Sequence, residues 1–304
     1  MPHPFDVLHL GSASRDVVSD DPRGWRLGGG VTFAALTTAR LGLRTAAWIG
    51  ADGAAGSAWE LDLLRDAGVE VAIAPLPDSP VFVNEERPGG RVQYARSAGV
   101  RLPDAGPPGS WRTAAAWSVV PVADELPEGL PGWIPPDAFV ALGWQGLLRR
   151  LRAGRRVRRI GPRPHPVVAR ADLVGLSRMD IGRDVPHRAL TALLHDGAHL
   201  VVTDGDAGGW VMEAVAGHPT RRRRYRAVPA IDSVDPTGAG DVFLGALVAQ
   251  RLDDPGARSG PTDAALRFAA AAASLVVGGP GLVGVPADAA AVTAALRPVA
   301  PGGG

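Results

Sequence analysis

The segment from Asp235 to Asp241 has the residue types and spacing of an anion-binding turn in front of a helix. Its sequence, DPTGAGD, runs directly into the apolar stretch VFLGALVAQ, which predicts a helix over Ala239–Gln250. A helix N-terminus carries roughly half a positive elementary charge and N–H groups without a helical partner, so it attracts anions. Gly238 and Gly240 have no Cβ, which would let a phosphate oxygen reach the main chain.

Asp241 would place a carboxylate beside the point where negative charge develops on such an anion. This position indicates a general base that takes the proton of an attacking hydroxyl during phosphoryl transfer. The alternative is that Asp241 only caps the helix. Aspartate caps are common, but a D-x-T-G-A-G-D run in front of a helix is not, so the pattern favours catalysis.

The composition excludes several other chemistries. All 32 basic residues are arginine and the chain has no cysteine, which rules out a Walker A loop, a Schiff-base lysine, disulfides and thiolate metal sites. Among the seven histidines only His195 and His199 have an H-x-x-x-H spacing, with no third ligand nearby in sequence, and no serine lies in a G-x-S-x-G elbow. With a net charge of +1, no long apolar run and no signal-peptide pattern, we expect a cytoplasmic enzyme without nucleic-acid or membrane partners.

Strands and helices alternate along much of the sequence, which favours an α/β fold with a mainly parallel sheet. The glycines that follow the predicted helices, such as Gly42 and Gly68, are typical helix stops. The expected strands are Phe5–Gly11, Thr45–Gly50, Ala171–Leu176 and Leu200–Thr203, and the expected helices besides Ala239–Gln250 are Val31–Leu41, Ala58–Ala67 and Asp263–Val277.

Two kinds of segment depart from this alternation. Val81–Ala95 predicts a β-hairpin with a Pro-Gly-Gly turn at residues 88–90, and a hairpin inserted in an α/β pattern is a natural lid over a site. Arg149–Arg159 and Arg221–Arg226 are rich in arginine. We expect solvated loops and helix faces there rather than an anion or nucleic-acid patch.

The DPTGAGD run and the elements before it closely resemble the ribokinase-like (PfkB) carbohydrate kinases over nearly the whole chain. The resemblance implies one domain over residues 1–304: a three-layer α/β/α core with a mainly parallel sheet and a small β lid from residues of about 13–27 and 80–97. It implies ATP and Mg²⁺ as cofactors. Some relatives need a monovalent cation and members often pair through their lids, so a cation requirement and a homodimer stay open for this chain.

The resemblance also assigns roles in phosphate and nucleotide binding. Gly238, Ala239 and Gly240 would form the anion hole, and Asp241 would be the base. Ala269–Ser274 would help to wall the adenine pocket. The nucleotide-binding residues implied are Thr203, Gly205, Asp235, Thr237, Ala270 and Ser274.

For the acceptor, Asp16 and the pair Gly28 and Gly29 match the segments that bind substrate hydroxyls in the family. The run Gln145-Gly-Leu-Leu-Arg149, the lid residues Asn84 and Gln93, and the late Gly284-Val-Pro286 resemble a subgroup that includes inositol kinases. A polyol suits Asp16, Gln145 and Arg149 as hydrogen-bonding partners. For Gln145 and Arg149 the alternative is a helix cap and a surface charge.

Two positions depart from the family pattern. Phe33 stands where sugar-binding members have an asparagine, so it would either stack on a substrate ring or belong to the core. Ser177-x-x-Asp180 replaces N-x-x-E, and Asp180 would either reach a magnesium-bound water or cap a helix. The expected activity is ATP-dependent phosphorylation of an inositol, aminocyclitol or sugar. The alternatives are a nucleoside kinase and a non-catalytic ligand-binding relative, the latter opposed by the intact Asp241.

Overall fold

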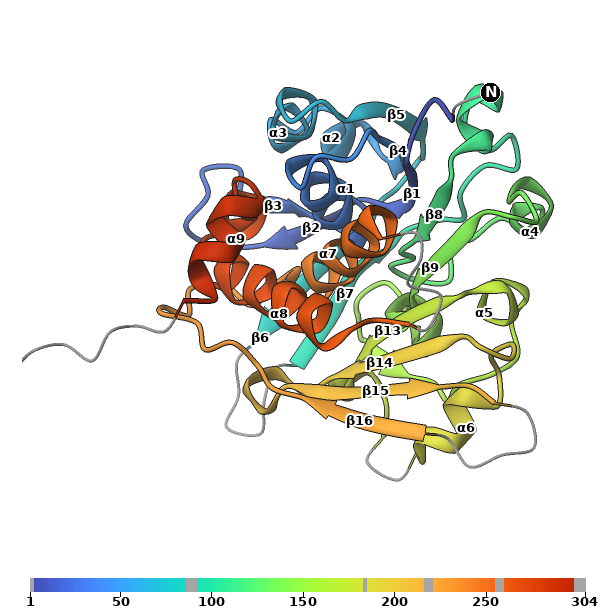
Figure 1. The fold of residues 1–304 in the computed structure, drawn as a ribbon. Coiled ribbons are helices and arrows are strands. Elements are labelled where there is room, and N and C mark those ends of the chain that lie inside the picture. The colour runs from blue at the N-terminus through green and yellow to red at the C-terminus, as the bar shows by residue number, and fades with distance from the viewer. Residues whose placement is uncertain (1–2, 86–91, 183–184, 216–220, 255–259, 298–304) are drawn as a thin grey trace, which may run out of the picture.

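A nine-stranded sheet with helices on both faces forms the body of the molecule, and a five-stranded sheet stands beside it (Figure 1). The computed structural model describes residues 3–85, 92–182, 185–215, 221–254 and 260–297. The prediction of a three-layer α/β/α core with a small β lid is confirmed. The turn predicted at residues 88–90 lies outside the described residues.

The large sheet is parallel except at one edge, where the pairing between its last three strands is antiparallel. All six residues of its strand β1 are buried. A strand covered on both faces needs no alternation of apolar and polar residues, and β1 is mostly apolar, with His9 and Ser12 as buried polar residues. The strand order is β16 (Arg221–Tyr225), β15 (Gly209–Glu213), β14 (His199–Thr203), β13 (Leu173–Ser177), β9 (Phe139–Gly143), β8 (Ala116–Val119), β1 (Val7–Ser12), β4 (Thr45–Ala51) and β5 (Glu70–Pro75).

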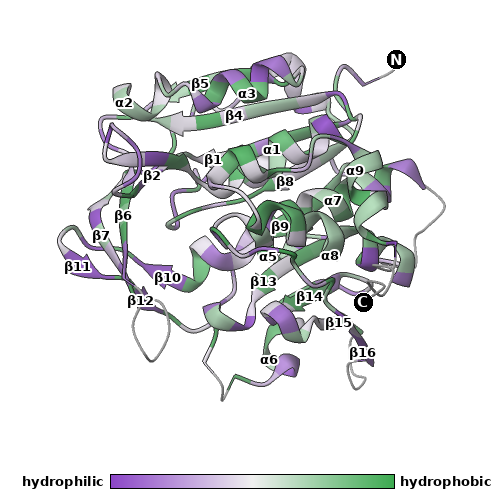
Figure 2. Cartoon of the chain, turned by 90° about the vertical axis from the view of Figure 1, so that its left-hand side faces the viewer, coloured by the Kyte–Doolittle hydropathy of each residue, from purple (hydrophilic) through white to green (hydrophobic). Residues whose placement is uncertain are grey.

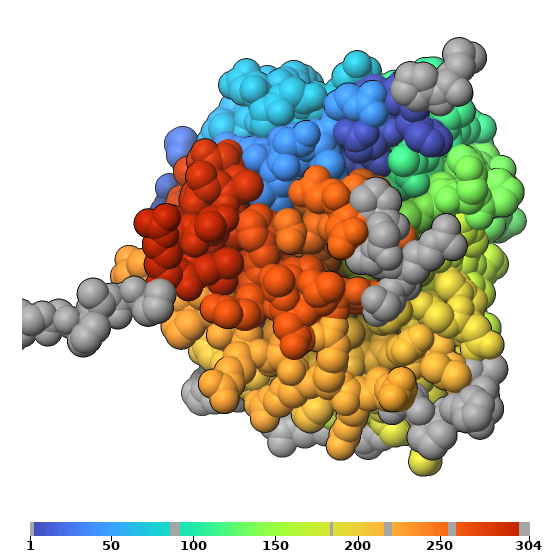
Figure 3. All heavy atoms as spheres, in the orientation of Figure 1, coloured from blue at the N-terminus to red at the C-terminus, as the bar shows by residue number. Residues whose placement is uncertain are grey.

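Two apolar clusters fill the space on either side of this sheet. The first lies under α1 (Gly30–Arg40), α3 (Glu60–Asp66), α7 (Ala239–Asp253), α8 (Asp263–Val277) and α9 (Ala289–Ala295). The second lies under α4 (Leu130–Trp133), α5 (Pro166–Arg170) and α6 (His187–Thr191). The short helix α2 (Gly53–Gly56) directly follows strand β4. Helices α7 to α9, orange to red in Figure 3, cover the middle of the first face.

Helix α7 packs against both α1 and α8, and eight successive residues, 242–249, are buried. The alanine-rich α8 has the predicted bounds, and its small side chains allow the two helices to lie close together. The helix predicted over Ala58–Ala67 is shorter and covers only Glu60–Asp66.

The lid sheet has the strand order β11 (Arg155–Arg156), β7 (Val92–Ala98), β6 (Pro80–Glu85), β2 (Ser14–Val17) and β3 (Trp25–Gly28). Strands β6 and β7 pair antiparallel, so the predicted hairpin is confirmed. In Figure 2 the lid strands β2, β6, β7 and β11 stand at the left, next to the short strands β10 (Arg149–Arg150) and β12 (Arg158–Arg159).

The expectation of loops and helix faces for the arginine-rich segments is wrong. Strand β10 pairs with β12, β11 adds an edge to the lid, and β16 forms an edge of the large sheet. Backbone pairing decides the structure here, and charged side chains at exposed strand edges disfavour pairing with other chains. Across the described ranges, no helix is both long and apolar enough to cross a membrane.

Candidate active site

The predicted site residues gather where the parallel strands of the large sheet end, under the lid. Asp16 follows β1, Gln145 and Arg149 follow β9, and Asp180 follows β13. Ligands of open α/β sheets bind at this carboxyl edge. Arg149 lies close enough to Asp16, Asp180 and Asp241 for all three carboxylates to act on its charge, so the structure brings these side chains together.

The anion turn has the geometry that its glycines predict. Gly238 is the N-cap residue of the fifteen-residue helix α7, with a left-handed φ of 81°. The Asp241 N–H donates to the Gly238 carbonyl at 3.0 Å, and the Thr237 N–H donates to Asp235 Oδ1 at 2.9 Å, which shapes the turn. A Cβ at Gly240 would meet no atom within 4 Å, so this side of the turn has room for an anion.

Asp241 lies in the first turn of α7 and faces the start of α1. A Cβ at Gly30 would stand only 2.6 Å from Asp241 Oδ1, so glycine is required for this approach. Burial raises the pKa of Asp241 to about 7, Arg149 lowers it in part, and Asp180 raises it. A carboxyl group with a pKa near neutrality is suited to take up and release a proton at physiological pH.

Asp16 lies on the lid strand β2, opposite β3. A Cβ at Gly28 would be 2.5 Å from Asp16 Oδ2, so the carboxylate rests directly on the main chain of β3. Gly29 has φ of 100° and caps α1, where any other residue would be strained. These glycines connect the lid to α1 and hold Asp16 and Asp241 on either side of that connection.

Gln145 and Arg149 are neither a helix cap nor a free surface charge. Gln145, in the 3₁₀ helix η2 (Trp144–Leu148), makes no cap hydrogen bond, and its Nε2 donates to Asp180 Oδ1 at 3.0 Å. Arg149 donates from Nε to the Val122 carbonyl at 2.6 Å and from Nη1 to Gln93 Oε1 at 3.1 Å. Burial lowers the pKa of Arg149, and the surrounding carboxylates act against that decrease.

Asp180 closes a capping box at the 3₁₀ helix η3 (Arg178–Asp180), where its Oδ2 accepts the Ser177 N–H at 2.8 Å. The pKa of Asp180 is raised, because the effect of burial exceeds the opposing effects of Gln145, the Ser177 N–H and Arg149. Within the described ranges, no three His, Asp or Glu side chains are grouped to hold a metal ion. Mg²⁺ commonly binds through one or two carboxylates and substrate phosphates, so Asp180 with a bound donor fits such an ion.

Phe33 is a core residue. Its side chain is 1% exposed, and its ring lies against Gly238. Therefore no face of the ring is available to stack on a substrate, and the expectation of stacking is replaced by the core alternative. Helix α1 buries eight of its eleven residues, and that packing fixes the ring.

The residues expected near the nucleotide lie on three elements. Thr203 ends β14, and Gly205 begins the 3₁₀ helix η4 (Gly205–Ala207). Asp235 and Thr237 are in the anion turn. Ala270 is only 6% exposed because it packs in the first apolar cluster, whereas Ser274 is half-buried and its hydroxyl donates to the Ala271 carbonyl at 2.9 Å.

Exposed apolar side chains beside the turn were not predicted from the sequence. Ile231 is 91% exposed, Val234 is 62% exposed and Val283, in the 3₁₀ helix η5 (Gly281–Gly284), is 55% exposed. The Val234 N–H donates to the Val277 carbonyl, and the segment that carries Val283 folds back on Gly279, so both segments meet at the C-terminal end of α8. A run such as IDSV before the turn contains the residues but gives no sign of their exposure.

A mostly parallel sheet with a β lid over its carboxyl edge, and an anion turn that carries an aspartate, are the arrangement of the ribokinase-like fold. Residues 170–288 match the sequence model described as pfkB family carbohydrate kinase, which confirms the resemblance to that family. The protein is thus a phosphotransferase that acts on a hydroxyl group. A search of curated proteins found no match.

Solved structures with this fold include kinases for different acceptors. A pyrophosphate-dependent kinase in the ribokinase family, complexed with a pyrophosphate analogue and myo-inositol, has a TM-score of 0.70 at 21% identity over 95% of this chain and 99% of that one. Arabidopsis thaliana ribokinase complexed with ribose and ATP has a TM-score of 0.65 at 17% identity, over 96% of this chain and 99% of that one. The nucleoside kinase of Methanocaldococcus jannaschii has a TM-score of 0.65 at 13% identity, over 96% of this chain and 98% of that one.

Proposed function

We propose that this protein transfers the terminal phosphoryl group of ATP to a hydroxyl of a small polyol: an inositol, an aminocyclitol or a sugar. The observation that carries the proposal is the position of Asp241. Its carboxyl group has a pKa of about 7 and lies at the open N-terminus of α7, across from the lid residue Asp16.

In the proposed reaction, the acceptor lies between the lid and the anion turn. Asp241 accepts the proton of the acceptor hydroxyl, whose oxygen forms a bond to the terminal phosphorus as the bond from that phosphorus to the leaving diphosphate breaks. N–H groups at Gly238–Gly240 and the positive end of α7 stabilise the charge on the phosphoryl group. Asp180 would be the carboxylate that holds Mg²⁺, and the ion would supply positive charge that stabilises the donor phosphates.

A polyol acceptor is supported by the polar side chains that line the underside of the lid. Asp16, Asn84 and Gln93 lie on one face of the lid sheet, as their strand registers show, and Gln93 Nε2 donates to Asn84 Oδ1 at 3.0 Å. Such groups suit a ring that carries hydroxyls. The nucleoside alternative rested on stacking by Phe33, and the burial of that ring removes its support.

Pyrophosphate is the second candidate donor, because a kinase of similar fold depends on it. The exposed side chains of Ile231, Val234 and Val283 favour ATP. A nucleotide base could cover these apolar groups next to the phosphates, whereas pyrophosphate would leave them in water. The two donors therefore differ in what they bury beyond the anion turn.

The test is a kinase assay with ATP or pyrophosphate against inositols, aminocyclitols, pentoses, hexoses and nucleosides, with and without Mg²⁺ and K⁺. We expect ATP-dependent turnover of a polyol that disappears in Asp241→Asn. Asp253→Asn is the matched control, since this exposed aspartate lies at the other end of the same helix. ATP binding without turnover of any acceptor would favour the non-catalytic alternative.

A further inference from the structure

Arg149 is held so that one edge of its guanidinium group stays available. Nε and Nη1 are bound by the Val122 carbonyl and by Gln93, and the group stacks over the Phe82 ring with 4.9 Å from Cζ to the ring centroid. Nη2 makes no hydrogen bond to any side chain or carbonyl within the described ranges. A guanidinium with three fixed contacts loses little conformational entropy when its last edge binds a ligand.

Glu125 holds in place the loop that contains Val122, the residue to which Arg149 donates. Glu125 is 4% exposed, and its carboxylate accepts N–H groups from Val122 at 2.8 Å, Ala123 at 2.6 Å and Ser12 at 3.1 Å. This fixes the Val122 carbonyl to which Arg149 donates. The position of the guanidinium is therefore set by the core from below and by the lid residue Gln93 from the side.

Arg149 supplies a positive charge beside the base Asp241, although several carboxylates surround it. Arg149 is the arginine whose charge acts on Asp241, and it lies among the carboxylates of Asp16 and Asp180 as well. The chain contains no lysine to supply a positive charge at the anion turn. A neutral hydroxyl needs no buried cation, whereas a phosphoryl group gains charge-assisted hydrogen bonds from a guanidinium.

We propose that Arg149 is a catalytic residue that binds the phosphoryl group in transit between donor and acceptor, and does not bind an acceptor hydroxyl. The inference rests on the proposed function. As the bond from phosphorus to the leaving diphosphate breaks and the bond to the acceptor oxygen forms, Nη2 donates to an equatorial phosphoryl oxygen, and the acceptor proton passes to Asp241. Gln93 is the positioning residue that connects this contact to the lid.

The test compares Arg149→Lys and Arg149→Met with Arg150→Met, an exposed arginine on the same strand β10. A transition-state contact predicts that kcat falls by about 100-fold or more in Arg149→Met and less in Arg149→Lys, with the acceptor KM changed by no more than about threefold. A raised acceptor KM with kcat unchanged would show that Arg149 binds the acceptor and would overturn the proposal.

A binding measurement covers the case in which the methionine variant folds poorly. ADP with aluminium fluoride and acceptor mimics the phosphoryl group in transit. Arg149→Lys should bind ATP with wild-type affinity and lose most of its affinity for this mimic, and equal affinity for the mimic would reject the role. A wild-type protein without turnover on any acceptor would refute the proposed function itself, which is a different result from either outcome in the variants.

Discussion

The ring of Phe33 lies against the main chain of Gly238, so that a Cβ at position 238 would fall well inside the 3.0 Å that real Cβ atoms keep from their neighbours. Phe33 belongs to α1, and Gly238 caps α7. The anion turn is thus supported from below by a buried aromatic ring. This contact explains why a glycine with positive φ is needed at the turn, independently of any phosphate.

Gly238→Ala should therefore damage both stability and activity. The new Cβ would meet the Phe33 ring and would also strain a backbone with φ of 81°. We expect a loss of about 2 kcal/mol or more in the free energy of unfolding, together with most of kcat. Chemical denaturation and steady-state kinetics measure the two effects.

Gly240→Ala separates phosphate binding from folding. Its Cβ would point into open space inside a helix, where alanine is more stable than glycine by up to about 1 kcal/mol. We expect unchanged or higher stability, with a raised KM for ATP and a lower kcat because the methyl group occupies the space of a phosphate oxygen. Full activity would show that the phosphate does not approach this side of the turn.

Phe33→Leu tests whether the ring serves the core or the acceptor. Because the side chain is fully enclosed, we expect about 1–3 kcal/mol of destabilisation and no change in the order of preferred acceptors. A selective loss of activity on one ring-shaped acceptor, with stability unchanged, would contradict the assignment to the core.

The parts of the fold that follow from local pattern were predicted from the sequence. The bounds of α8, the start of α7 and the pairing of β6 with β7 each depend on signals within a few residues of one another. The DPTGAGD turn was also predicted from local pattern, since its glycines and aspartates shape the turn in which they lie.

What the sequence could not predict depends on distant partners. The burial of Phe33 follows from the packing of α1 on α7, and the anchoring of Glu125 depends on N–H groups from two segments. The arginine-rich strand β11 has no apolar alternation, and it forms a strand only because β7 offers an edge to pair with. No local pattern contains that information.

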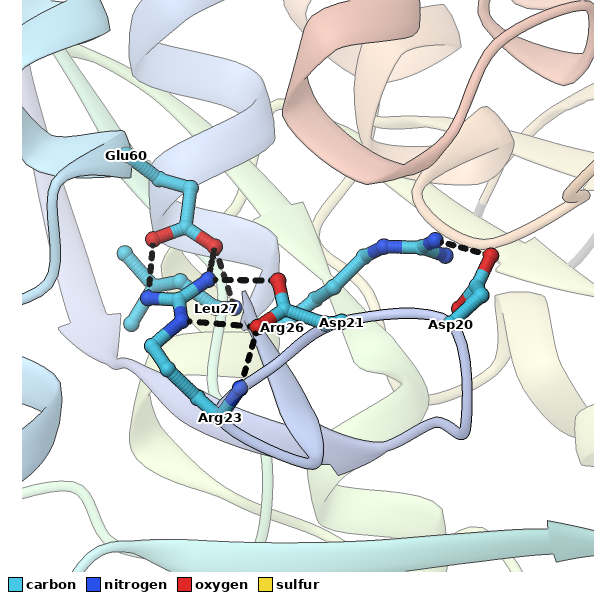
Figure 4. A network of polar contacts seen from close by, with 6 residues as sticks. All are labelled: Asp20, Asp21, Arg23, Arg26, Leu27 and Glu60. Carbon is cyan, nitrogen blue, oxygen red and sulfur yellow. Dashed lines mark hydrogen bonds and ion pairs between the residues drawn. The ribbon is translucent and has the colours of Figure 1, made fainter.

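The β2–β3 hairpin of the lid is fastened to the core by an ionic network around Glu60, which Figure 4 shows. Glu60 on α3 is 3% exposed and accepts from Arg23 at 2.6 and 2.8 Å and from the Leu27 N–H at 3.1 Å. Burial would raise the pKa of Glu60, but these partners outweigh it and lower that pKa. Since Leu27 precedes Gly28, Glu60 holds the strand on which the Asp16 carboxylate rests.

Glu60→Gln should loosen this connection without removing bulk. We expect a loss of about 1–3 kcal/mol of stability, because Arg23 is left half-buried without its full counter-charge. The acceptor KM should rise several-fold while the KM for ATP stays near its wild-type value. Arg65→Met is the control: its exposed pair with Asp62 on the same helix should be worth about 0.5 kcal/mol or less. Equal changes in the KM for the acceptor and the KM for ATP would argue against a specific role of the β2–β3 hairpin in acceptor binding.

The pH dependence of activity should report Asp241. The base works only when ionised, so kcat/KM should rise about tenfold per pH unit below pH 7 and level off above it, given its pKa of about 7. The Asp253→Asn control should leave the profile unchanged, because that aspartate is exposed and far along the helix. An acidic limb near pH 4 would mean that Asp241 has an ordinary pKa or is not the base.

The raised pKa of Asp241 also makes the stability of the fold depend on pH, and stability should fall over the pH range in which activity rises. Asp241 binds its proton more tightly in the folded protein than in the unfolded chain, because burial raises its pKa above the ordinary 3.8. Its contribution to stability is therefore fully present below about pH 4 and is lost as the pH rises through about 7. Asp241→Asn removes this loss, so it should stabilise the protein at pH 8 by on the order of 1–3 kcal/mol while abolishing turnover.

Thermal unfolding of wild type and Asp241→Asn across pH 4 to 9 tests this directly. The difference in Tm should be near zero at pH 4, grow between pH 4 and 7, and stay constant above that range, since the ionised carboxylate is present only there. A variant that is less stable than wild type at every pH would show that the Asp241 carboxylate stabilises the fold. The carboxylate would then be a structural cap of α7 and not a strained catalytic group.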